Sequence, residues 1–271
     1  MSLEAYAQFY ALLERHVGIQ LDHTKQYLAD SRLAQLAQAH GHDDVVSLVK
    51  FLTTSPIGSV HWNAFEALTT NETYFFRDKQ VFDVLAQRVF PQLMEARRSE
   101  RALRIYCAAA STGQEVYSLL MMMRELFPDL KAWDVYVQAS DISDACLDRA
   151  KLGIYNAKEV DRGLPPEYMP KYFNKLPDGS FKIASGIRDA VHFSRQNLLD
   201  EPSGYPKFDL ILLRNVLIYF SNDTKLRILK NIHKQLARDH GLLLLGATES
   251  LLSHANFRAE SIGKVSFYAA V

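Results

Sequence analysis

The fold of this 271-residue chain is decided by Arg104-Ile105-Tyr106-Cys107-Ala108-Ala109-Ala110-Ser111-Thr112-Gly113-Gln114-Glu115. The stretch begins as a strand, passes through a turn of small residues and ends at a helix start, where the helix dipole favours Glu115. In a doubly wound sheet, a turn of this kind lies at the carboxyl end of a strand, where ligands bind. Small residues let the backbone approach an adenosyl or dinucleotide ligand closely. An ordinary strand–helix turn has the same composition, so the turn alone does not decide between the two interpretations.

From Leu103 onward, short apolar strands alternate with amphipathic helices. The expected strands are Leu103–Ala108, Asp134–Ala139, Val191–Ser194, Phe208–Leu213 and Gly241–Gly246, and the expected helices are Glu115–Leu126, Asp144–Lys151 and Thr224–Leu236. This alternation predicts an α/β fold with a mostly parallel, doubly wound sheet. A closing hairpin is expected from Phe257–Ser261 and Lys264–Ala270.

The first eighty or so residues contain helix signals and almost no strand signals. Helical periodicity is expected around Phe9–Val17, Asp22–His40, Val45–Leu52 and His61–Leu68. In the second of these segments, the apolar side is expected to carry Tyr27, Leu28, Leu33 and Leu36. We therefore expect a helical domain over residues 1–80 and a larger domain over residues 81–271.

A proline-containing stretch at about residues 156–190 interrupts the alternation for longer than an ordinary connection. It predicts an insertion with a small hairpin, in which Phe173–Leu176 pairs with Phe181–Ala184 across an Asp-Gly turn.

Composition narrows the functional classes. Lys plus Arg and Asp plus Glu balance at 31 each, so no global field recruits nucleic acid or anionic lipid. The longest apolar runs are strand-sized, and Met1-Ser2-Leu3-Glu4 lacks the features of a secretory signal. Cys107 and Cys146 show neither CxxC spacing nor a disulfide framework and are expected to be reduced, buried thiols. We expect a cytoplasmic monomer that is not inserted in a membrane.

An acidic residue, Asp141, closes the second expected strand of the sheet. In nucleoside-binding sheets, an acid at this position accepts hydrogen bonds from ribose hydroxyls, although Asp141 could instead cap the next helix. The chain lacks the G-x-G-x-x-G fingerprint of dinucleotide sites and the G-x-x-x-x-G-K-[ST] of a P-loop. The turn and the acid together favour a nucleoside ligand.

Two polar stretches complete the candidate site. The first covers residues 69–78; on a helix its Thr73 and Arg77 would share one face, whereas a linker packed by aromatic side chains fits equally well. The second begins with Arg214 and Asn215, directly after an apolar strand. Polar residues at a strand's carboxyl end lie where substrates are handled rather than in the core.

Taken together, these segments resemble the chemoreceptor glutamate methyltransferases of bacterial chemotaxis, the CheR family. The similar stretches are Thr-Thr-Asn-Glu-Thr-Tyr-Phe-Phe-Arg-Asp (69–78), Ala-Ala-Ala-Ser-Thr-Gly-Gln-Glu-Val-Tyr-Ser (108–118), Ala-Ser-Asp-Ile (139–142), Gly-Ile-Tyr (153–155), Asn-Leu-Leu (197–199), Arg-Asn-Val-Leu-Ile-Tyr-Phe (214–220) and Thr-Glu-Ser-Leu (248–251). Their order and spacing extend the resemblance over nearly the whole chain.

The resemblance implies an all-helical N-terminal domain and a class I, Rossmann-like methyltransferase domain with a small β-subdomain insertion. It implies S-adenosylmethionine as cofactor, S-adenosylhomocysteine as product, no metal, and the cytoplasmic helical domain of chemoreceptors as partner. The cofactor contacts that it implies are Asn71, Thr73, Arg77, Glu115, Asp141, Asn197, Leu198, Arg214 and Asn215. Tyr219 stands where the family has a tyrosine next to the transferred methyl group. We hypothesise that Arg214 or Arg77 offsets carboxylate charge and that Tyr219 helps to position the methyl group or the substrate oxygen.

The implied chemistry agrees with what the sequence lacks. A glutamate side chain has a pKa of about 4.3 and is already an ionised nucleophile at neutral pH. Attack on a sulfonium methyl needs in-line positioning more than a general base. No His/Asp dyad, zinc-ligand spacing or paired-carboxylate signature is therefore expected. The alternatives are a methyltransferase for another carboxylate, a non-catalytic module that senses the cofactor or docks to a signalling partner, and, more distantly, a dehydrogenase.

Three departures from the family pattern bear on partners. Gln114 and Val116 stand where many members have Glu and Pro, but Glu115 is retained. The second helix keeps Lys25 and Arg32, but it has uncharged residues at positions 35, 36 and 38, where receptor-binding members are often more basic. The β-subdomain segment 173–193 is short, so we do not expect it to bind a receptor's C-terminal tail.

Overall fold

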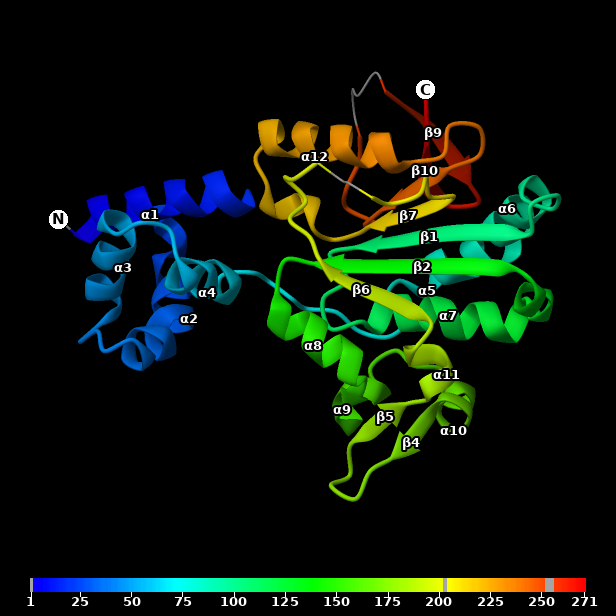
Figure 1. Ribbon diagram of the computed structural model, residues 1–271, viewed down its shortest axis with the longest axis horizontal. Coiled ribbons are helices and arrows are strands. Elements are labelled where there is room, and N and C mark those ends of the chain that lie inside the picture. Colours follow the sequence, from blue (N-terminus) through cyan, green and yellow to red (C-terminus); the bar gives the residue numbers. More distant parts are fainter. Residues whose placement is uncertain (1, 202–203, 252–255) are drawn as a thin grey trace. The chain divides into compact units, whose positions relative to one another are not determined.

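The computed structural model describes residues 2–201, 204–251 and 256–271, which form two compact units (Figure 1). The helical unit comprises Met1–Thr70 and Tyr219–Arg227, and the α/β unit comprises Asn71–Ile218 and Ile228–Val271. The first division falls after Thr70, earlier than the boundary at residue 80 expected from the sequence.

The helical unit contains α1 (Ser2–Val17), a 3₁₀ turn η1 (His23–Lys25), α2 (Gln26–Ala39), α3 (Val45–Thr54) and α4 (Ser59–Ala67). The expected helical character of this region is therefore confirmed. Helix α1 ends before Gly18, whose φ of 81° suits glycine. Helix α3 begins with a capping box in which Asp44 accepts a hydrogen bond from the Ser47 backbone N–H at 2.7 Å.

The expected apolar face of α2 is partly wrong. Leu33 is fully buried, but Tyr27 is 72% exposed. The buried stripe consists of Ala29, Leu33 and Ala37, which follow one another at i, i+4 spacing. Tyr27 stands off this stripe in the first turn of the helix, so its apolar ring does not enter the core.

The α/β unit is built on a seven-stranded sheet. Its strands are β1 (Ala102–Ala108), β2 (Asp134–Asp141), β6 (Val191–Arg195), β7 (Leu210–Leu213), β8 (Leu242–Leu245), β9 (Phe257–Ile262) and β10 (Val265–Ala270). The strand order is β6-β2-β1-β7-β8-β10-β9; the first five strands are parallel, and β10 pairs antiparallel with β8 and β9. The predicted parallel sheet and closing hairpin are both confirmed.

The connections between the strands define a switch point at the centre of the sheet. From β1 the chain passes through α7 (Gln114–Leu126) to β2 on one side, whereas from β7 it passes through α12 (Asn222–Gln235) to β8 on the other. Because such crossovers are right-handed, the two outward directions put α7 and the second half of α12 on opposite faces. Adjacent strands β1 and β7 thus open a ligand position at their carboxyl ends.

A helical stretch from residue 79 to 96 was not expected from the sequence. It consists of α5 (Lys79–Val84), a π-helical turn η2 (Leu85–Val89) and α6 (Phe90–Ala96). Pro91 lies in the first turn of α6, where a proline in a continuing helix would clash with the preceding turn. The wider π turn directly before it relieves that conflict, and Leu85, Val89 and Phe90 are buried in the core.

The insertion between α8 (Asp144–Leu152) and β6 forms a small separate sheet of order β3-β5-β4. The strands of this sheet are β3 (Ile154–Tyr155), β4 (Phe173–Lys175) and β5 (Phe181–Ile183). The insertion also contains the short helices α9 (Ala157–Asp161), α10 (Met169–Tyr172) and α11 (Ser185–Arg188). The expected hairpin is confirmed, with Phe173 opposite Ile183 and Lys175 opposite Phe181. Strand β3 was not predicted, since its two residues are too few to show periodicity.

Gly163 allows the insertion to pack against the segment after Thr70. Its φ is +89°, and a Cβ added there would lie 2.1 Å from the Phe75 carbonyl oxygen. We therefore expect Gly163→Ala to lower the free energy of unfolding by about 2 kcal/mol or more, measured by urea titration. Gly179→Ala is the matched control, because Gly179 has a similar φ of +84° but no atom within 4 Å of the added Cβ. Equal losses in the two variants would attribute the effect to backbone strain alone.

Candidate functional site

The turn after β1 has an unusual backbone. Ala109, Ser111 and Gly113 have φ values of +55°, +50° and +93°, so every second residue lies in the left-handed region. Two amide groups of the turn donate to the end of β2: Ala110 N–H to the Ser140 carbonyl at 2.9 Å, and Ser111 N–H to the Asp141 carboxylate. Small side chains are needed because the left-handed region disfavours bulky or β-branched residues. The turn predicted as the ligand site is therefore a fixed structure.

Asp141 fixes that turn from the end of β2. Its carboxylate is 6% exposed and accepts the Ser111 N–H at 2.8 Å and the Ser143 N–H at 3.0 Å. The alternative of a helix cap is not supported, because the N-cap of α8 is Ser143, whose side chain accepts the Cys146 N–H. Asp141 thus joins the carboxyl ends of β1 and β2.

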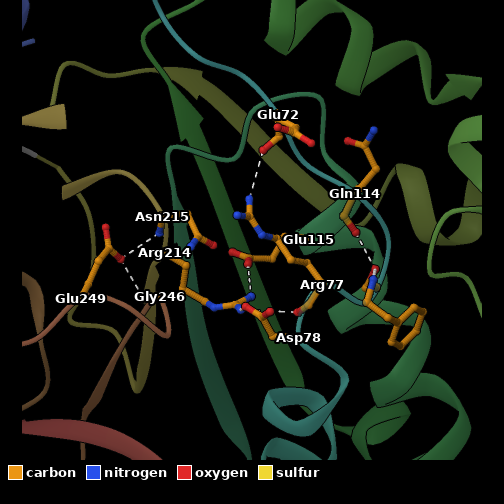
Figure 2. A network of polar contacts seen from close by, with 11 residues as sticks. Glu72, Arg77, Asp78, Gln114, Glu115, Arg214, Asn215, Gly246 and Glu249 are labelled. Atoms are coloured by element: carbon orange, nitrogen blue, oxygen red, sulfur yellow. Dashed lines mark hydrogen bonds and ion pairs between the residues drawn. The ribbon is translucent and has the colours of Figure 1, made fainter. Parts of the chain in front are cut away.

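Arg214 lies at the switch point in a buried ionic cluster (Figure 2). Its guanidinium donates to Glu115 Oε2 at 2.5 Å and to Asp78 Oδ2 at 2.5 Å, and the Arg214 side chain is 1% exposed. Glu115 comes from the first turn of α7, and Asp78 comes from the segment before α5. One cation faces two carboxylates, so the cluster carries a formal charge of about −1.

The Arg214 Nε is buried and has no hydrogen-bond partner in the described ranges 2–201, 204–251 and 256–271. A buried donor of this kind costs free energy until it is satisfied. The cluster therefore combines excess negative charge with one unsatisfied donor, a combination that suits a ligand carrying both a cationic group and an acceptor.

The segment from Asn71 to Asp78 is held against the turn and α7. Ser111 Oγ donates to the Asn71 carbonyl at 2.7 Å, and Phe76 N–H donates to Ser118 Oγ at 2.9 Å. The segment is not helical, so the condition under which Thr73 and Arg77 would share a helix face is not met, and the alternative of an aromatic-packed linker agrees with the structure. Phe75 and Phe76 are both buried in the core, where they anchor the segment.

Two of the predicted cofactor residues in this segment differ in their surroundings. The Arg77 guanidinium turns back to its own segment and donates to the Glu72 carbonyl at 3.2 Å, whereas its carbonyl accepts from Arg214 at 3.4 Å (Figure 2). Thr73 is half-buried, and its contact with the cofactor stays a prediction.

Asn197 and Leu198 follow β6, the strand beside β2. Asn197 Oδ1 accepts the Leu199 N–H at 3.0 Å, and the Leu198 carbonyl accepts from the Asn231 side chain at 3.2 Å. Gln196 N–H donates to the Asp141 carbonyl at 2.9 Å, so the pairing of β6 with β2 extends to the residue before Asn197. These residues therefore lie at the same edge of the sheet as Asp141.

Asn215 follows Arg214 and has a left-handed φ of +58°. Its backbone N–H donates to Glu249 Oε2 at 2.8 Å, and Gly246 N–H donates to the same oxygen at 2.7 Å (Figure 2). Glu249 stands in one of the stretches that resemble the CheR family, but no sequence pattern assigns it to the site.

Tyr219 is grouped with the helical unit rather than with the α/β unit. Its carbonyl accepts the Gln20 N–H at 2.9 Å, and Phe220 forms an antiparallel bridge with Ile19. Its position beside a transferred methyl group stays a prediction.

A His/Asp dyad is present, contrary to expectation. His240 Nε2 lies 2.6 Å from Asp209 Oδ1, and Asp209 Oδ2 accepts the Arg104 N–H at 2.7 Å. Asp209 is 1% exposed and lies just before β7, at the amino edge of the parallel strands. The dyad was missed because its members are 31 residues apart in sequence. It lies at the edge of the sheet opposite the candidate site, where Asp209 connects the beginning of β7 to β1 and to the residues before β8.

Both cysteines are free and buried, as predicted. Burial raises the pKa of the Cys107 thiol well above its usual value, so it stays protonated and is a poor nucleophile. Among the described residues, no group of three or more His, Cys, Asp or Glu side chains could hold a metal ion. None of the helices in that part of the chain combines the length and hydropathy that a bilayer span requires.

Comparison with known families covers nearly all of the chain. Residues 4–69 match the CheR methyltransferase all-alpha domain, and residues 71–265 match the CheR methyltransferase SAM binding domain. The chain belongs to the CheR methyltransferase family. The two matched domains meet close to the division between the compact units after Thr70.

Individual relatives of this CheR-family chain are similar over most of their length. Chemotaxis protein methyltransferase 1 of Pseudomonas aeruginosa is 42% identical over 90% of this chain and 89% of that protein. Chemotaxis protein methyltransferase of Vibrio anguillarum is 39% identical over 93% and 90%. Chemotaxis protein methyltransferase Cher2 of Pseudomonas putida is 38% identical over 91% and 90%.

The residues at the switch point fit the cofactor of a CheR-type domain. S-Adenosylmethionine carries ribose hydroxyls and an amino-acid end with an ammonium and a carboxylate group. The negatively charged cluster suits the ammonium group, and the unsatisfied Arg214 Nε suits an acceptor such as the carboxylate. Asp141, at the end of β2, suits the ribose hydroxyls. The individual contacts remain predictions.

Sequence reasoning missed two residues that complete the site, Asp78 and Glu249. Asp78 is the last residue of the quoted stretch 69–78, and its left-handed φ of +62° and its pairing with Arg214 appear only in three dimensions. An acidic residue directly before a helix was the one available signal, and it has an ordinary explanation as a cap.

Proposed function

We propose that this CheR-family chain transfers the methyl group of S-adenosylmethionine to glutamate side chains on the cytoplasmic helical domain of chemoreceptors. The names of its relatives support a role in chemotaxis. The observation that carries the proposal is the Glu115–Arg214–Asp78 cluster at the switch point of a CheR-type sheet.

Methyl transfer from a sulfonium to a carboxylate requires positioning and charge complementarity rather than proton transfer. When bound, S-adenosylmethionine supplies a methyl carbon attached to a sulfonium sulfur. A glutamate carboxylate oxygen forms the new C–O bond while the C–S bond breaks, and the products are a neutral ester and a thioether. No proton moves, so a site without a general base suffices.

In this scheme, residues of the chain bind and orient. Glu115 binds the cofactor's ammonium group. Arg214 is fixed by its two carboxylate partners and offsets only part of their charge, so the cluster remains negative. Asp141 accepts from ribose hydroxyls while it keeps the 109–113 turn in place. Arg214 or Arg77 offsets the charge of the substrate carboxylate. Tyr219 helps to position the methyl group or the substrate oxygen.

Receptor recognition by α2 is expected to rely little on Arg32. The Arg32 guanidinium already donates to the carbonyl oxygens of Leu68 and Thr69, at 3.1 and 2.8 Å, at the end of α4. Lys25 is exposed at the start of α2. With uncharged residues at positions 35, 36 and 38, α2 suits receptors whose methylation helices are less acidic than usual.

The test is transfer of labelled methyl from S-adenosylmethionine to cytoplasmic fragments of several receptors. We expect label that mild base releases, as it does from an ester, and equal rates with and without receptor C-terminal tails. Cofactor binding without transfer to any fragment would contradict the proposal and favour a non-catalytic sensing module. Base-stable label would exclude carboxyl methylation.

A further inference from the structure

One carboxylate, that of Glu249, joins the segments after β7 and β8. Its Oε2 accepts the N–H groups of Asn215 and Gly246 at 2.8 and 2.7 Å. Its Oε1 accepts those of Leu217 and Ile218 at 2.7 and 3.3 Å. Four backbone donors from two neighbouring strand ends therefore converge on a single side chain at the cofactor edge of the sheet.

The space around this carboxylate is closed on the Gly246 side. A Cβ added to Gly246 would lie 2.6 Å from Glu249 Oε2, 2.7 Å from Asn215 Nδ2 and 2.8 Å from Asn215 N. Gly246 is not among the residues with a left-handed φ, so its backbone would accept alanine. It is the close approach of Glu249 and Asn215 that excludes a side chain here.

Asn215 is the residue whose conformation this arrangement controls. Its left-handed φ of +58° is uncommon outside glycine and persists only where the surroundings fix it. The hydrogen bond from its N–H to Glu249 and the contact with Gly246 supply that constraint. The same constraint sets the direction of the Asn215 side chain.

We infer that Glu249 is a positioning residue for cofactor binding, which acts by holding Asn215 and the 215–218 segment in their binding conformation. This inference rests on the proposed function, because it takes S-adenosylmethionine as the ligand. Glu249 itself touches backbone amides rather than the reacting atoms. A glutamine in its place would offer one acceptor oxygen and would turn its NH₂ group toward two N–H donors.

The experiment is calorimetric titration of S-adenosylmethionine into the folded, full-length protein without receptor. We expect Glu249→Gln and Gly246→Ala each to raise the Kd for S-adenosylmethionine by about tenfold or more. Losses of this size are typical of metal sites when a residue that orients a metal ligand is removed. Because both substitutions disturb one contact, the double variant should bind little worse than either single variant. Glu95→Gln and Gly58→Ala are the matched controls: Glu95 is 73% exposed, and an added Cβ at Gly58 comes no closer than 3.9 Å to any atom.

A kinetic readout separates positioning from general damage. We expect the KM for S-adenosylmethionine to rise while the KM for the receptor fragment stays within about twofold of wild type. Cofactor affinity within about twofold of wild type in folded Glu249→Gln or Gly246→Ala protein would overturn the inference, as would equal rises in both KM values. Wild-type protein that binds the cofactor but methylates no receptor would contradict the proposed substrate, while the binding comparison would still decide the role of Glu249.

Discussion

Replacing Arg214 by methionine is expected to abolish measurable methyl transfer and to destabilise the fold. The substitution leaves the carboxylates of Glu115 and Asp78, whose side chains are 14% and 34% exposed, facing each other without a cation. Removing one partner of a buried ionic group typically costs about 3–5 kcal/mol, because the remaining charge is uncompensated. Because solvent partly screens Asp78, we expect a loss at or below the lower end of that range in urea unfolding. We expect at least about a hundredfold loss in kcat/KM.

Two further variants show whether geometry or charge is responsible. Arg214→Lys keeps the charge but loses the planar fork that serves two carboxylates, so most of the activity should still be lost. Arg258→Met is the matched control, since the Arg258 side chain is 68% exposed and pairs with Glu260 on the surface. Wild-type activity in Arg214→Lys would contradict a role for the fixed guanidinium geometry.

Replacing Asp141 by asparagine is expected to weaken cofactor binding by about 10- to 100-fold, equivalent to one charged hydrogen bond. Asparagine keeps the shape but has one acceptor oxygen for the two N–H groups, from Ser111 and Ser143, that Asp141 now accepts. The turn after β1 should loosen, and any hydroxyl bound by the carboxylate should lose its acceptor. Titration of S-adenosylmethionine into the folded variant measures the effect.

Asp178→Asn is the matched control for this prediction. Asp178 accepts the Ser180 N–H at 2.9 Å in the same local pattern, but it lies exposed in the β4–β5 hairpin. We expect its cofactor affinity to equal that of wild type. Equal affinity in Asp141→Asn would show that the end of β2 does not contact the cofactor.

Much of the fold could be predicted from the sequence because the sheet strands are short, apolar and regularly separated. Leu210–Leu213 and Leu242–Leu245 are fully buried, and a continuous apolar run is the pattern of a strand covered on both faces. The helical stretch from residue 79 to 96 escaped prediction, since Pro91 interrupts the signal and a π turn accommodates it. Tyr27 was misassigned because periodicity alone does not set the rotation of a helix about its axis.

The candidate site was less predictable than the sheet. Residues that end a strand, such as Asp141 and Arg214, can be placed together because parallel strands share one edge. Asp78 and Glu249 could not, because each reaches the site from a separate segment. Asp78 lies 136 residues from its partner Arg214, and Glu249 lies 34 residues from Asn215. The resemblance to the CheR family identified the stretches that contain both residues, but only tertiary structure shows which oxygen meets which donor.

We propose that the chain esterifies glutamate side chains of chemoreceptors. The most direct measurement is mass-spectrometric mapping of a receptor cytoplasmic fragment after incubation with the protein and methyl-labelled S-adenosylmethionine, with Arg214→Met as the inactive control. We expect base-labile methyl groups on glutamate side chains of the receptor's helical domain with the wild-type protein only. Methyl groups on lysine, arginine or histidine, or a cofactor-bound protein that leaves every receptor fragment unmodified, would contradict it.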